Sequence, residues 1–445
     1  MNVQRKPEGL KREPLPEEWL VFGFLSIILL GALLLALPLS TRDGHSIGLF
    51  DSLFTATSAV CVTGLVAVDT GTTFSLFGQA VLMALIQVGG LGFMVFATRV
   101  MMRLGRRISI KNRMLIRESM NSASLSNLGG LARLYLMLAT GSEALGAALL
   151  AIRFIPMYGL RRGLWFAVFH AVSAFCNAGF DLFGNFTSLT GFTADPLVLL
   201  TVAAMIVLGG LGFSVILEVL RNRQGFKNLS LHARIVFTFT LALLLAGTVF
   251  YGLVDGDKMN ILNAFFQSVT MRTAGFNSVD LSALTDGSKL FSSFLMMIGA
   301  SPASTGGGMK TTSVAVVALL ILSVVKGDSE VNAGRRRISA DTVRRALAVV
   351  ALFLTMLMLG TLSLSIIEGG RFSLADILFE CSSAMGTVGV SAIGTPNLHP
   401  ASRAVLLPMM FLGRVGPLTL AIAVARRQGR VKPASKYPEE KIMIG

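Results

Sequence analysis

Four short segments of the chain share one pattern, in which a mostly apolar stretch leads to a glycine that is followed by a hydrophobic residue. They read SAVCVTGL at 58–65, SAFCNAGF at 173–180, VTMRTAGF at 269–276 and SAMGTVGV at 383–390. Alignment places the glycines at Gly64, Gly179, Gly275 and Gly389. The segments contain no acidic side chain, so a cation that sheds its water there must be bound by backbone carbonyl oxygens. Glycine suits such a site because carbonyls point at an ion only where φ takes values that are costly for other residues.

The candidate ligands are the backbone oxygens of the five residues that end at each glycine. They are Val60, Cys61, Val62, Thr63 and Gly64; Phe175, Cys176, Asn177, Ala178 and Gly179; Met271, Arg272, Thr273, Ala274 and Gly275; and Met385, Gly386, Thr387, Val388 and Gly389. A helix that precedes each segment and points its C-terminal end at the ion would add a favourable negative potential.

A second unusual stretch, GASPASTGGGMKTT, lies at 299–312 inside a long apolar run. Pro302 and the three glycines at 306–308 would break any helix there. A nucleotide-binding P-loop needs glycine directly before lysine, whereas Met309 precedes Lys310, so nucleotide binding is set aside. The free amides of such a loop can bond only to protein or to water, so the loop is predicted to border a cavity.

Three basic residues, Arg272, Lys310 and Arg414, stand in apolar surroundings. A buried cation is costly in a membrane, and such residues normally face a cavity or a partner. Lys310 and Arg414 are interpreted as a positive barrier on the path of an ion, the alternative being that they extend to the membrane surface. Arg272 is interpreted as a brace of the third segment rather than an ion ligand, with Asp280 as its candidate partner.

The composition predicts a membrane protein. Of the 445 residues 53% are hydrophobic and only 14% are charged, and the mean hydropathy is +0.70. Ordinary soluble domains contain about 25% charged residues, so this chain lacks the polar residues that a water-facing surface needs. Three scattered cysteines give neither a disulfide framework nor a tetrahedral metal site. The sequence also offers no catalytic triad, no paired catalytic carboxylates and no redox motif, so no enzyme is predicted.

Eight apolar segments are long enough to cross about 30 Å of hydrocarbon, which takes about 20 residues. Their limits are 19–40, 73–98, 131–156, 196–220, 231–254, 290–325, 343–367 and 402–425. Shorter apolar stretches, which fit half-helices that enter the membrane and return, lie between the spans of each pair. They occupy 47–60, 163–176, 259–271 and 372–385. The predicted fold class is an all-α polytopic membrane protein, with four tandem span–pore-helix–span repeats around a pseudo-fourfold pore.

The segments of the chain follow from this division. They are a cytoplasmic N-terminus (1–18), four repeats (19–107, 131–227, 231–327 and 343–427) and a cytoplasmic C-terminal tail (428–445). GGLGF occurs at 89–93 and again at 209–213, in the spans that follow the first two glycine segments, and is interpreted as helix-packing glycine.

The net charge of +15 at first suggests nucleic acid as a partner. However, most Lys and Arg residues fall in clusters at the ends of apolar segments rather than on one basic face. This alternation is what the positive-inside rule produces, with both termini in the cytoplasm. No nucleic-acid partner is predicted; the lipid bilayer is the partner.

On these motifs, the chain resembles the membrane subunit of the Ktr/Trk/HKT superfamily of potassium transporters, and most closely its bacterial KtrB branch. Family filters have one glycine per loop, and this sequence agrees at all four. A serine in the first loop accompanies sodium transport in the family, so Gly64 implies potassium selectivity. The resemblance implies a subunit of a bacterial potassium uptake system in the cell membrane, with potassium as the transported ion, sodium as a second candidate and no organic cofactor.

The resemblance further implies that the loop at 299–312 lies below the filter as a gate. The candidate gate residues are Gly299, Ser301, Pro302, Ser304, Thr305, Gly306, Gly307, Gly308, Lys310 and Arg414. It also implies a homodimer and a ring of cytosolic Rossmann-type subunits that bind ATP or ADP, since a regulated pore without its own cytosolic domain needs a separate control subunit.

Two other classes of protein were compared with this interpretation. A secondary carrier built from inverted repeats should have a broken helix in both halves, whereas the sequence shows one obvious break, at 299–312, and repeats of one orientation. A membrane sensor without conduction should have an output domain, and the cytoplasmic segments are too short for one.

Overall fold

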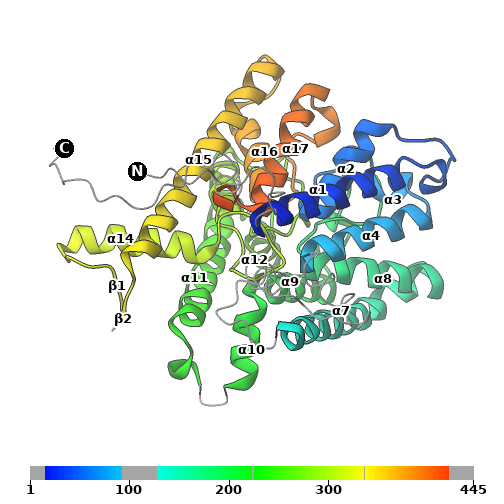
Figure 1. The fold of residues 1–445 in the computed structure, drawn as a ribbon. Coiled ribbons are helices and arrows are strands. Elements are labelled where there is room, and N and C mark those ends of the chain that lie inside the picture. Colours follow the sequence, from blue (N-terminus) through cyan, green and yellow to red (C-terminus); the bar gives the residue numbers. More distant parts are fainter. Residues whose placement is uncertain (1–15, 93–127, 223–224, 335, 420–445) are drawn as a thin grey trace, which may run out of the picture.

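The protein is mainly helical, as predicted. The computed structural model describes residues 16–92, 128–222, 225–334 and 336–419 (Figure 1). Its α-helices are α1 (Pro16–Leu35), α2 (Leu49–Cys61), α3 (Thr70–Thr73), α4 (Leu76–Leu91), α7 (Leu128–Tyr158), α8 (Leu160–Phe175), α9 (Pro196–Leu211), α10 (Phe213–Arg221), α11 (Leu231–Val254), α12 (Ile261–Thr270), α13 (Asp286–Met297), α14 (Thr311–Lys326), α15 (Ala340–Glu368), α16 (Leu374–Gly386) and α17 (Pro400–Val415). The N-terminal 15 residues, the tail from 420 and the ends of the second and eighth predicted spans lie outside the described residues.

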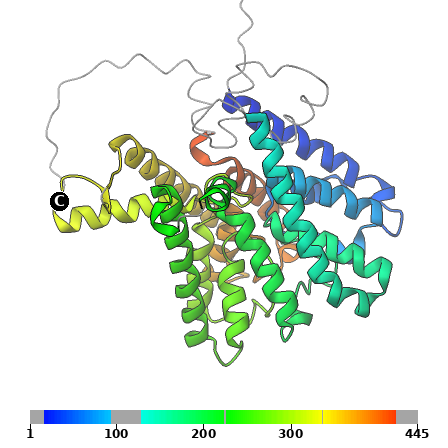
Figure 2. The ribbon, with the colours of Figure 1, turned by 90° about the horizontal axis from the view of Figure 1, so that it is seen from below.

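Within these ranges the β-structure is one hairpin, β1 (Asn332–Ala333) with β2 (Arg336–Arg337), which joins α14 to α15. In two views this yellow arm of α14, the hairpin and the start of α15 projects from the rest of the protein (Figures 1 and 2).

Helix starts are specified locally by capping residues. Ser75, Asn260, Thr285 and Ser373 each accept a hydrogen bond from the backbone N–H three residues later, at the starts of α4, α12, α13 and α16. These bonds satisfy amides that have no partner within the helix. The beginnings of two predicted short helices, α12 and α16, and of two following spans, α4 and α13, are therefore fixed by residues visible in the sequence, whereas α2 and α8 begin after Gly48 and Gly159 without a side-chain cap.

The four predicted half-helices are present as helices. α2, α8, α12 and α16 lie within one to three residues of the predicted limits, and each runs directly into one of the glycine segments. The helical interruption predicted at 299–312 is also confirmed, because α13 ends at Met297 and α14 begins at Thr311.

Fewer helices than predicted have the length and hydropathy of a complete span. In the described residues there are four: Glu18–Leu35, Gly130–Tyr158, Leu231–Val254 and Ala340–Glu368. A fifth candidate is the pair α9 and α10, which is bent by 94°. Helices lie at the other predicted spans, but α4 and α17 have 16 residues each and the sixth span is divided between α13 and α14.

The prediction that a span breaks at only one obvious place is wrong. The fourth predicted span ends its helix at Leu211 and turns at Gly212, which has φ +92°. Gly92 and Gly416 end α4 and α17 with φ values of +81° and +91° and nearly the same ψ. The last glycine of each GGLGF motif is therefore a helix terminator, because an L-residue rarely adopts this conformation.

Polar contacts join each repeat to the next at the level where the short helices begin. They are Trp165 Nε1 to Gln79 Oε1 (2.8 Å), Asn263 Nδ2 to the Thr193 carbonyl (3.0 Å), Lys289 Nζ to Asp376 (2.7 Å) and Arg403 to Asp51 (2.8 Å). The last pair joins α17 to α2, and Figure 1 shows orange α17 beside the blue first helices. The segments assigned to the four predicted repeats thus contact one another in a closed order.

The ring-closing pair Arg403–Asp51 is expected to stabilise the fold measurably. Both side chains are largely buried, so Arg403→Asp leaves two uncompensated carboxylates and should cost about 3 kcal/mol. Adding Asp51→Arg should recover most of that loss. Thermal unfolding of the purified protein in detergent measures both. As a control, Arg153→Ala removes an exposed ion pair with Asp195 within one repeat and should cost no more than about 1 kcal/mol. Additive effects of the two charge reversals would contradict the direct pairing.

Candidate functional site

The four glycine segments share one backbone conformation. Each has a residue in the left-handed region two positions before its glycine: Val62 (φ +58°), Asn177 (+57°), Thr273 (+72°) and Thr387 (+53°). The glycines have φ values of +94°, +69°, +85° and +96°. Left-handed φ costs about 1 kcal/mol or more at a residue with a side chain, and is rarer still at β-branched Val and Thr. Four different sequences adopt this unfavourable backbone conformation two residues before the glycine, which indicates a common geometric requirement.

The four glycines lie side by side in a closed ring. A Cβ atom on Gly64 would come within 2.5 Å of the Ala178 carbonyl oxygen, and one on Gly179 within 2.9 Å of the Ala274 oxygen. Likewise, a Cβ on Gly275 would overlap the Val388 oxygen, and one on Gly389 would overlap the Thr63 oxygen. Each loop thus abuts the carbonyl that precedes the glycine of the next loop, in the order one, two, three, four and back to one.

Hydrogen bonds to the preceding helices hold each loop in place. The amides of Thr63, Ala178 and Val388 each donate, at 2.8 Å, to the backbone oxygen of a serine five residues earlier. In the first and fourth loops the hydroxyls of these serines, Ser58 and Ser383, also accept from the glycine N–H at 3.0 Å. The sequence analysis missed these serines, although the pair Ser-Ala at the start of three segments was the signal that could have found them.

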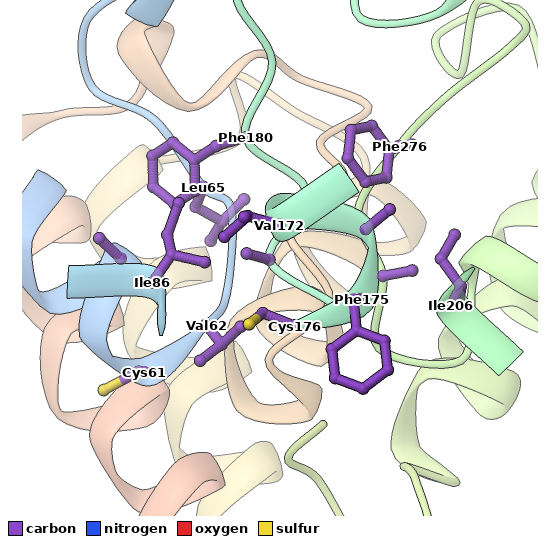
Figure 3. Packing of buried hydrophobic residues seen from close by; sticks show 14 of the residues in the cluster. Cys61, Val62, Leu65, Ile86, Val172, Phe175, Cys176, Phe180, Ile206 and Phe276 are labelled. Carbon is purple, nitrogen blue, oxygen red and sulfur yellow. The ribbon is translucent and has the colours of Figure 1, made fainter. Parts of the chain in front are cut away.

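The second and third loops are held differently. Ser173 donates its hydroxyl hydrogen to the Phe180 oxygen at 2.7 Å, beyond the glycine. The third loop has Val269 at the corresponding position, and Thr270 donates to the Phe276 oxygen at 2.6 Å instead. Behind the loops, buried apolar side chains such as Val62, Leu65, Phe175 and Phe276 fill the space between loops and spans (Figure 3).

Three of the four predicted ligand stretches begin with a carbonyl that lies against another part of the chain. The carbonyls of Val60, Phe175 and Met385 face the following spans, where a Cβ atom on Gly89, Gly209 or Gly413 would overlap them. The Phe175 oxygen also accepts the Thr305 hydroxyl at 2.9 Å. These carbonyls, which still belong to the ends of α2, α8 and α16, are therefore contacts between loop and span.

Arg272 does not pair with Asp280, so that part of the prediction is wrong. Asp280 instead accepts from the amide and hydroxyl of Ser282, at 2.9 and 2.7 Å. The Arg272 side chain is buried, with its Nε unpaired. A brace role for Arg272 has no ion pair to support it.

The glycine-rich loop between α13 and α14 bonds to the glycine motifs of two other repeats. Ser301 N–H and Thr305 N–H donate to the carbonyls of Gly210 and Gly209, at 3.0 and 3.1 Å. Gly308 N–H donates to the Gly413 carbonyl at 3.1 Å. Protein acceptors thus satisfy these three amides of the broken helix, and Ala303, Ser304 and Gly306 border a cavity, as predicted for this loop.

This loop lies directly against the base of the ring. A Cβ atom on Gly306 would overlap the Thr273 hydroxyl, and one on Gly307 would overlap the Thr387 hydroxyl. Thr273 and Thr387 are the residues with left-handed φ in loops three and four. Glycines at 306 and 307 are therefore required by close approach to these side chains.

Arg414 connects the glycine-rich loop to the first repeat. Its guanidinium donates to the Thr305 carbonyl and to the carbonyls of Gly89 and Gly90, the last at 2.9 Å. Arg414, named from the sequence together with the residues of the loop, does contact it, but the sequence did not indicate that the first GGLGF motif would be its other partner. Lys310 Nζ donates to the Gly306 oxygen at 2.7 Å within the same loop.

The ring and the glycine-rich loop lie between two cavities of opposite charge. A cavity of about 410 Å³ touches all four ring glycines and is lined by Asp69, Asp181 and Asp280. A second cavity of about 440 Å³ lies against the glycine-rich loop and is lined by Lys310 and Arg414. Asp69 and Asp181 were not identified from the sequence, since they stand outside the glycine segments, and Asp280 was named only as a candidate partner of Arg272.

Asp181 follows the second ring glycine by two residues and makes the acidic cavity sensitive to pH. Burial raises the pKa of this carboxyl to about 7, and the neighbouring charge of Asp69 acts in the same direction. A carboxyl with a raised pKa loses its charge as the pH falls through that value, so the cavity becomes less negative below neutral pH.

The TrkH family, described as cation transport proteins, matches residues 25–253 and 235–432 of this chain. The chain belongs to this family. Cation transport proteins are not enzymes, in agreement with the absence of catalytic motifs in the sequence.

Relatives match along nearly their whole length. The chain is 39% identical to a Ktr system potassium uptake protein B of Bacillus subtilis (strain 168), over 97% of each chain. It is 35% identical to the potassium/sodium uptake protein NtpJ of Enterococcus hirae, over 100% of each chain. The crystal structure of the potassium transporter TrkH from Vibrio parahaemolyticus has the same fold, with a TM-score of 0.68, 16% identity and coverage of 94% of this chain and 86% of the other.

Adjacent glycines in the second GGLGF motif are expected to tolerate alanine very differently. Gly209→Ala puts a methyl group onto the Phe175 oxygen and 2.8 Å from the Thr305 hydroxyl, and should cost about 1–3 kcal/mol or more. Gly210→Ala meets its nearest atom, Asn177 Nδ2, at an ordinary 3.5 Å and should change stability little. The midpoint of thermal unfolding in detergent compares the two variants. Equal behaviour would show that the span does not approach the loop as closely as described.

Proposed function

We propose that this chain is the potassium-translocating membrane subunit of a bacterial potassium uptake system. The observation that carries the proposal is the closed ring of four glycine loops, in which the carbonyls of Thr63, Ala178, Ala274 and Val388 lie next to the glycine of the neighbouring loop. Backbone oxygens replace the water shell of a potassium ion in filters of this kind. The names of the relatives, which denote potassium or potassium/sodium uptake, agree with this choice of ion.

The proposed architecture has eight membrane-crossing segments and four re-entrant helices around the ring. The helices at all eight predicted ranges and the short helix inside each pair support it. The clusters of Lys and Arg between repeats favour a cytoplasmic location for those connections and for both termini. On this orientation the acidic cavity faces outward and the cavity with Lys310 and Arg414 faces the cytoplasm.

The two cavities then act on an entering ion in sequence. Asp69, Asp181 and Asp280 attract cations to the outer cavity, because a cleft lined by one sign of charge concentrates counter-ions. The ring removes the ion's water. Below the ring, the glycine-rich loop occupies the path and Arg414 fastens it to Gly89 and Gly90, so this arrangement is the closed state of a gate.

Control of the gate is proposed to come from a second protein. The chain is similar to proteins named as parts of a Ktr system, and this supports a partner within such a system. We propose that this partner is a cytosolic ring of Rossmann-type subunits that bind ATP or ADP, acting on a homodimer of this chain. Sodium is proposed as a second ion, in keeping with the name of the Enterococcus relative.

Uptake measurements in potassium-transport-deficient bacteria test the proposed function. Cells that express this chain with its cytosolic partner should take up potassium and rubidium, and cells with the empty vector should not. Omission of the partner should reduce the rate. Normal membrane expression without uptake of either ion would contradict the proposal.

Gly64→Ser is expected to shift the ring towards sodium. At φ +94°, a side chain at residue 64 is strained and its Cβ meets the Ala178 oxygen, so the ring of ligands must change shape. The ratio of potassium to sodium uptake should fall by about tenfold, which corresponds to about 1.4 kcal/mol of discrimination. Gly44→Ser is the matched control, because Gly44 also has a positive φ but no atom near its Cβ position. An unchanged ratio in Gly64→Ser with normal expression would show that the ring does not select the ion.

Arg414→Ala is expected to change the maximal rate of potassium uptake more than the apparent affinity. The guanidinium holds the glycine-rich loop, whereas affinity depends on the ring, which Arg414 does not contact. Loss of the hydrogen bonds between Arg414 and the loop should raise the maximal rate severalfold and reduce the dependence of this rate on the cytosolic partner. Arg414→Lys should be intermediate, since lysine keeps the charge but cannot reach several carbonyls with a planar group. Kinetics over a range of external potassium measure both constants. A change in affinity alone would place Arg414 at the entrance or at the binding site.

A further inference from the structure

Glu143 is a buried acidic residue near the middle of α7, and its environment is unusual. Only 8% of it is exposed. Of the three other buried acids in the described residues, Asp255 and Glu368 have a basic partner in Lys258 and Arg371, and Glu380 accepts from two hydroxyls, those of Ser391 and Thr395. Among those residues Glu143 forms no ion pair, and its hydrogen bonds come from one uncharged side chain, Gln87 of α4. An ionisable group placed this way in a membrane protein is costly and usually serves function.

Gln87 connects Glu143 to the second glycine loop. Its amide Nε2 donates to both carboxylate oxygens of Glu143, at 2.9 and 3.1 Å. Its Oε1 accepts from the Sγ of Cys176 at 3.5 Å. Cys176 caps the C-terminal end of α8, where the loop leaves the helix. Both ends of the amide are therefore in use, one towards the acid and the other towards the loop.

The same contact extends to Arg414. Gly90 is three residues after Gln87, and a Cβ atom on it would lie 2.7 Å from Cys176 Sγ, so α4 packs directly against the start of the loop. The Gly90 carbonyl accepts from Arg414 at 2.9 Å. A continuous series of contacts thus runs from Glu143 through Gln87, Cys176 and Gly90 to the arginine that holds the glycine-rich loop.

Few other charges can influence this series. α4 and α9, which flank it, contain no charged residue. On α8 the titratable groups nearest Cys176 are His170, six residues earlier, and Arg161 and Arg162 at the other end of the helix. On α7 itself the nearest groups are Tyr135 and Arg153, each at least two turns from Glu143. Gln87 and, through it, Cys176 are therefore the polar groups that respond most directly to the charge of Glu143.

We propose that Glu143 and Gln87 form a proton-dependent switch that sets the position of the second loop and the hydrogen bonds by which Arg414 holds the glycine-rich loop. With Glu143 ionised, the Gln87 amide donates to the carboxylate and accepts from the Cys176 thiol, as in this structure. When Glu143 binds a proton, its hydroxyl becomes a donor, and the amide gains by turning over so that Oε1 accepts from the acid and Nε2 faces the sulfur. The only covalent change is the proton that Glu143 gains, and Glu143 is a positioning residue because it does not touch the ion.

The test rests on the proposed potassium transport and uses purified full-length protein in liposomes, with the same pH on both sides. Rubidium flux is measured between about pH 6 and about pH 8.5 for wild type, Glu143→Gln and Asp181→Asn. A one-unit pKa difference between two conformations changes their ratio about tenfold, so wild-type flux should change about threefold or more over this range. Glu143→Gln replaces the carboxyl group by an amide of the same shape that cannot titrate, and should lose the part of the pH profile that Glu143 contributes. Asp181→Asn removes the separate contribution of the outer cavity to the pH profile, and this variant should retain the contribution of Glu143.

A second variant covers the case in which Glu143→Gln does not fold. Gln87→Met keeps the volume of the side chain and leaves Glu143 in place, but removes the amide, and should flatten the profile in the same way. Thr140→Val, at an exposed position one turn away on α7, should retain the wild-type profile. A wild-type flux independent of pH, or unchanged profiles in both Glu143→Gln and Gln87→Met, would overturn the switch. Absence of rubidium flux in wild-type protein would instead contradict the proposed function, so the two failures are distinguishable.

Discussion

The structure depends on how closely four backbone segments can approach one another around a single axis. Each ring glycine lies against the carbonyl of the next loop, where a side-chain carbon would overlap or nearly overlap that oxygen. The approach requires left-handed backbone at eight positions, four of which carry side chains. That cost is offset by the hydrogen bonds that Ser173 and Thr270 donate and that Ser58 and Ser383 accept, and by the closed arrangement of the loops, which leaves none of them with a free edge.

Close backbone approach is also required around the ring, where further sets of glycines allow it. Gly89, Gly209 and Gly413 allow three spans to touch the ends of the short helices, and Gly306 and Gly307 allow the glycine-rich loop to touch the base of the ring. A third set, Gly92, Gly212 and Gly416, ends helices at equivalent places. These breaks recur with nearly the same backbone conformation along the chain, in keeping with the tandem repeats proposed above. An inverted-repeat carrier would instead show them in opposite orientations.

The features that could be predicted from the sequence are those that depend on a local pattern of residues. The short helices, the loop glycines and the interruption between α13 and α14 were all visible, because apolar length, capping residues and Gly or Pro specify them within a few residues. Contacts between distant segments could not be predicted in this way. The pairing of Arg272 with Asp280 was inferred from nearness in sequence and is wrong, whereas Arg414 lies more than 300 residues from its partners Gly89 and Gly90. The bend at Gly212 was missed because the surrounding residues are as apolar as those of a continuous span.

Arg414 shows how a positive charge can belong to a cation pathway. A guanidinium cannot lose its proton at physiological pH, and in this chain it forms no ion pair with a described residue. Its hydrogen bonds go instead to carbonyls at the end of α4 and in the glycine-rich loop, where partial negative charge is concentrated because the helix has ended or is interrupted. The helix ends at Gly92 and between α13 and α14 therefore supply the carbonyl acceptors that stabilise the positive charge of Arg414 inside the protein. If the loop moves as the proposed function requires, Arg414 loses one of those acceptors, so the free energy of that movement includes the change in solvation of Arg414.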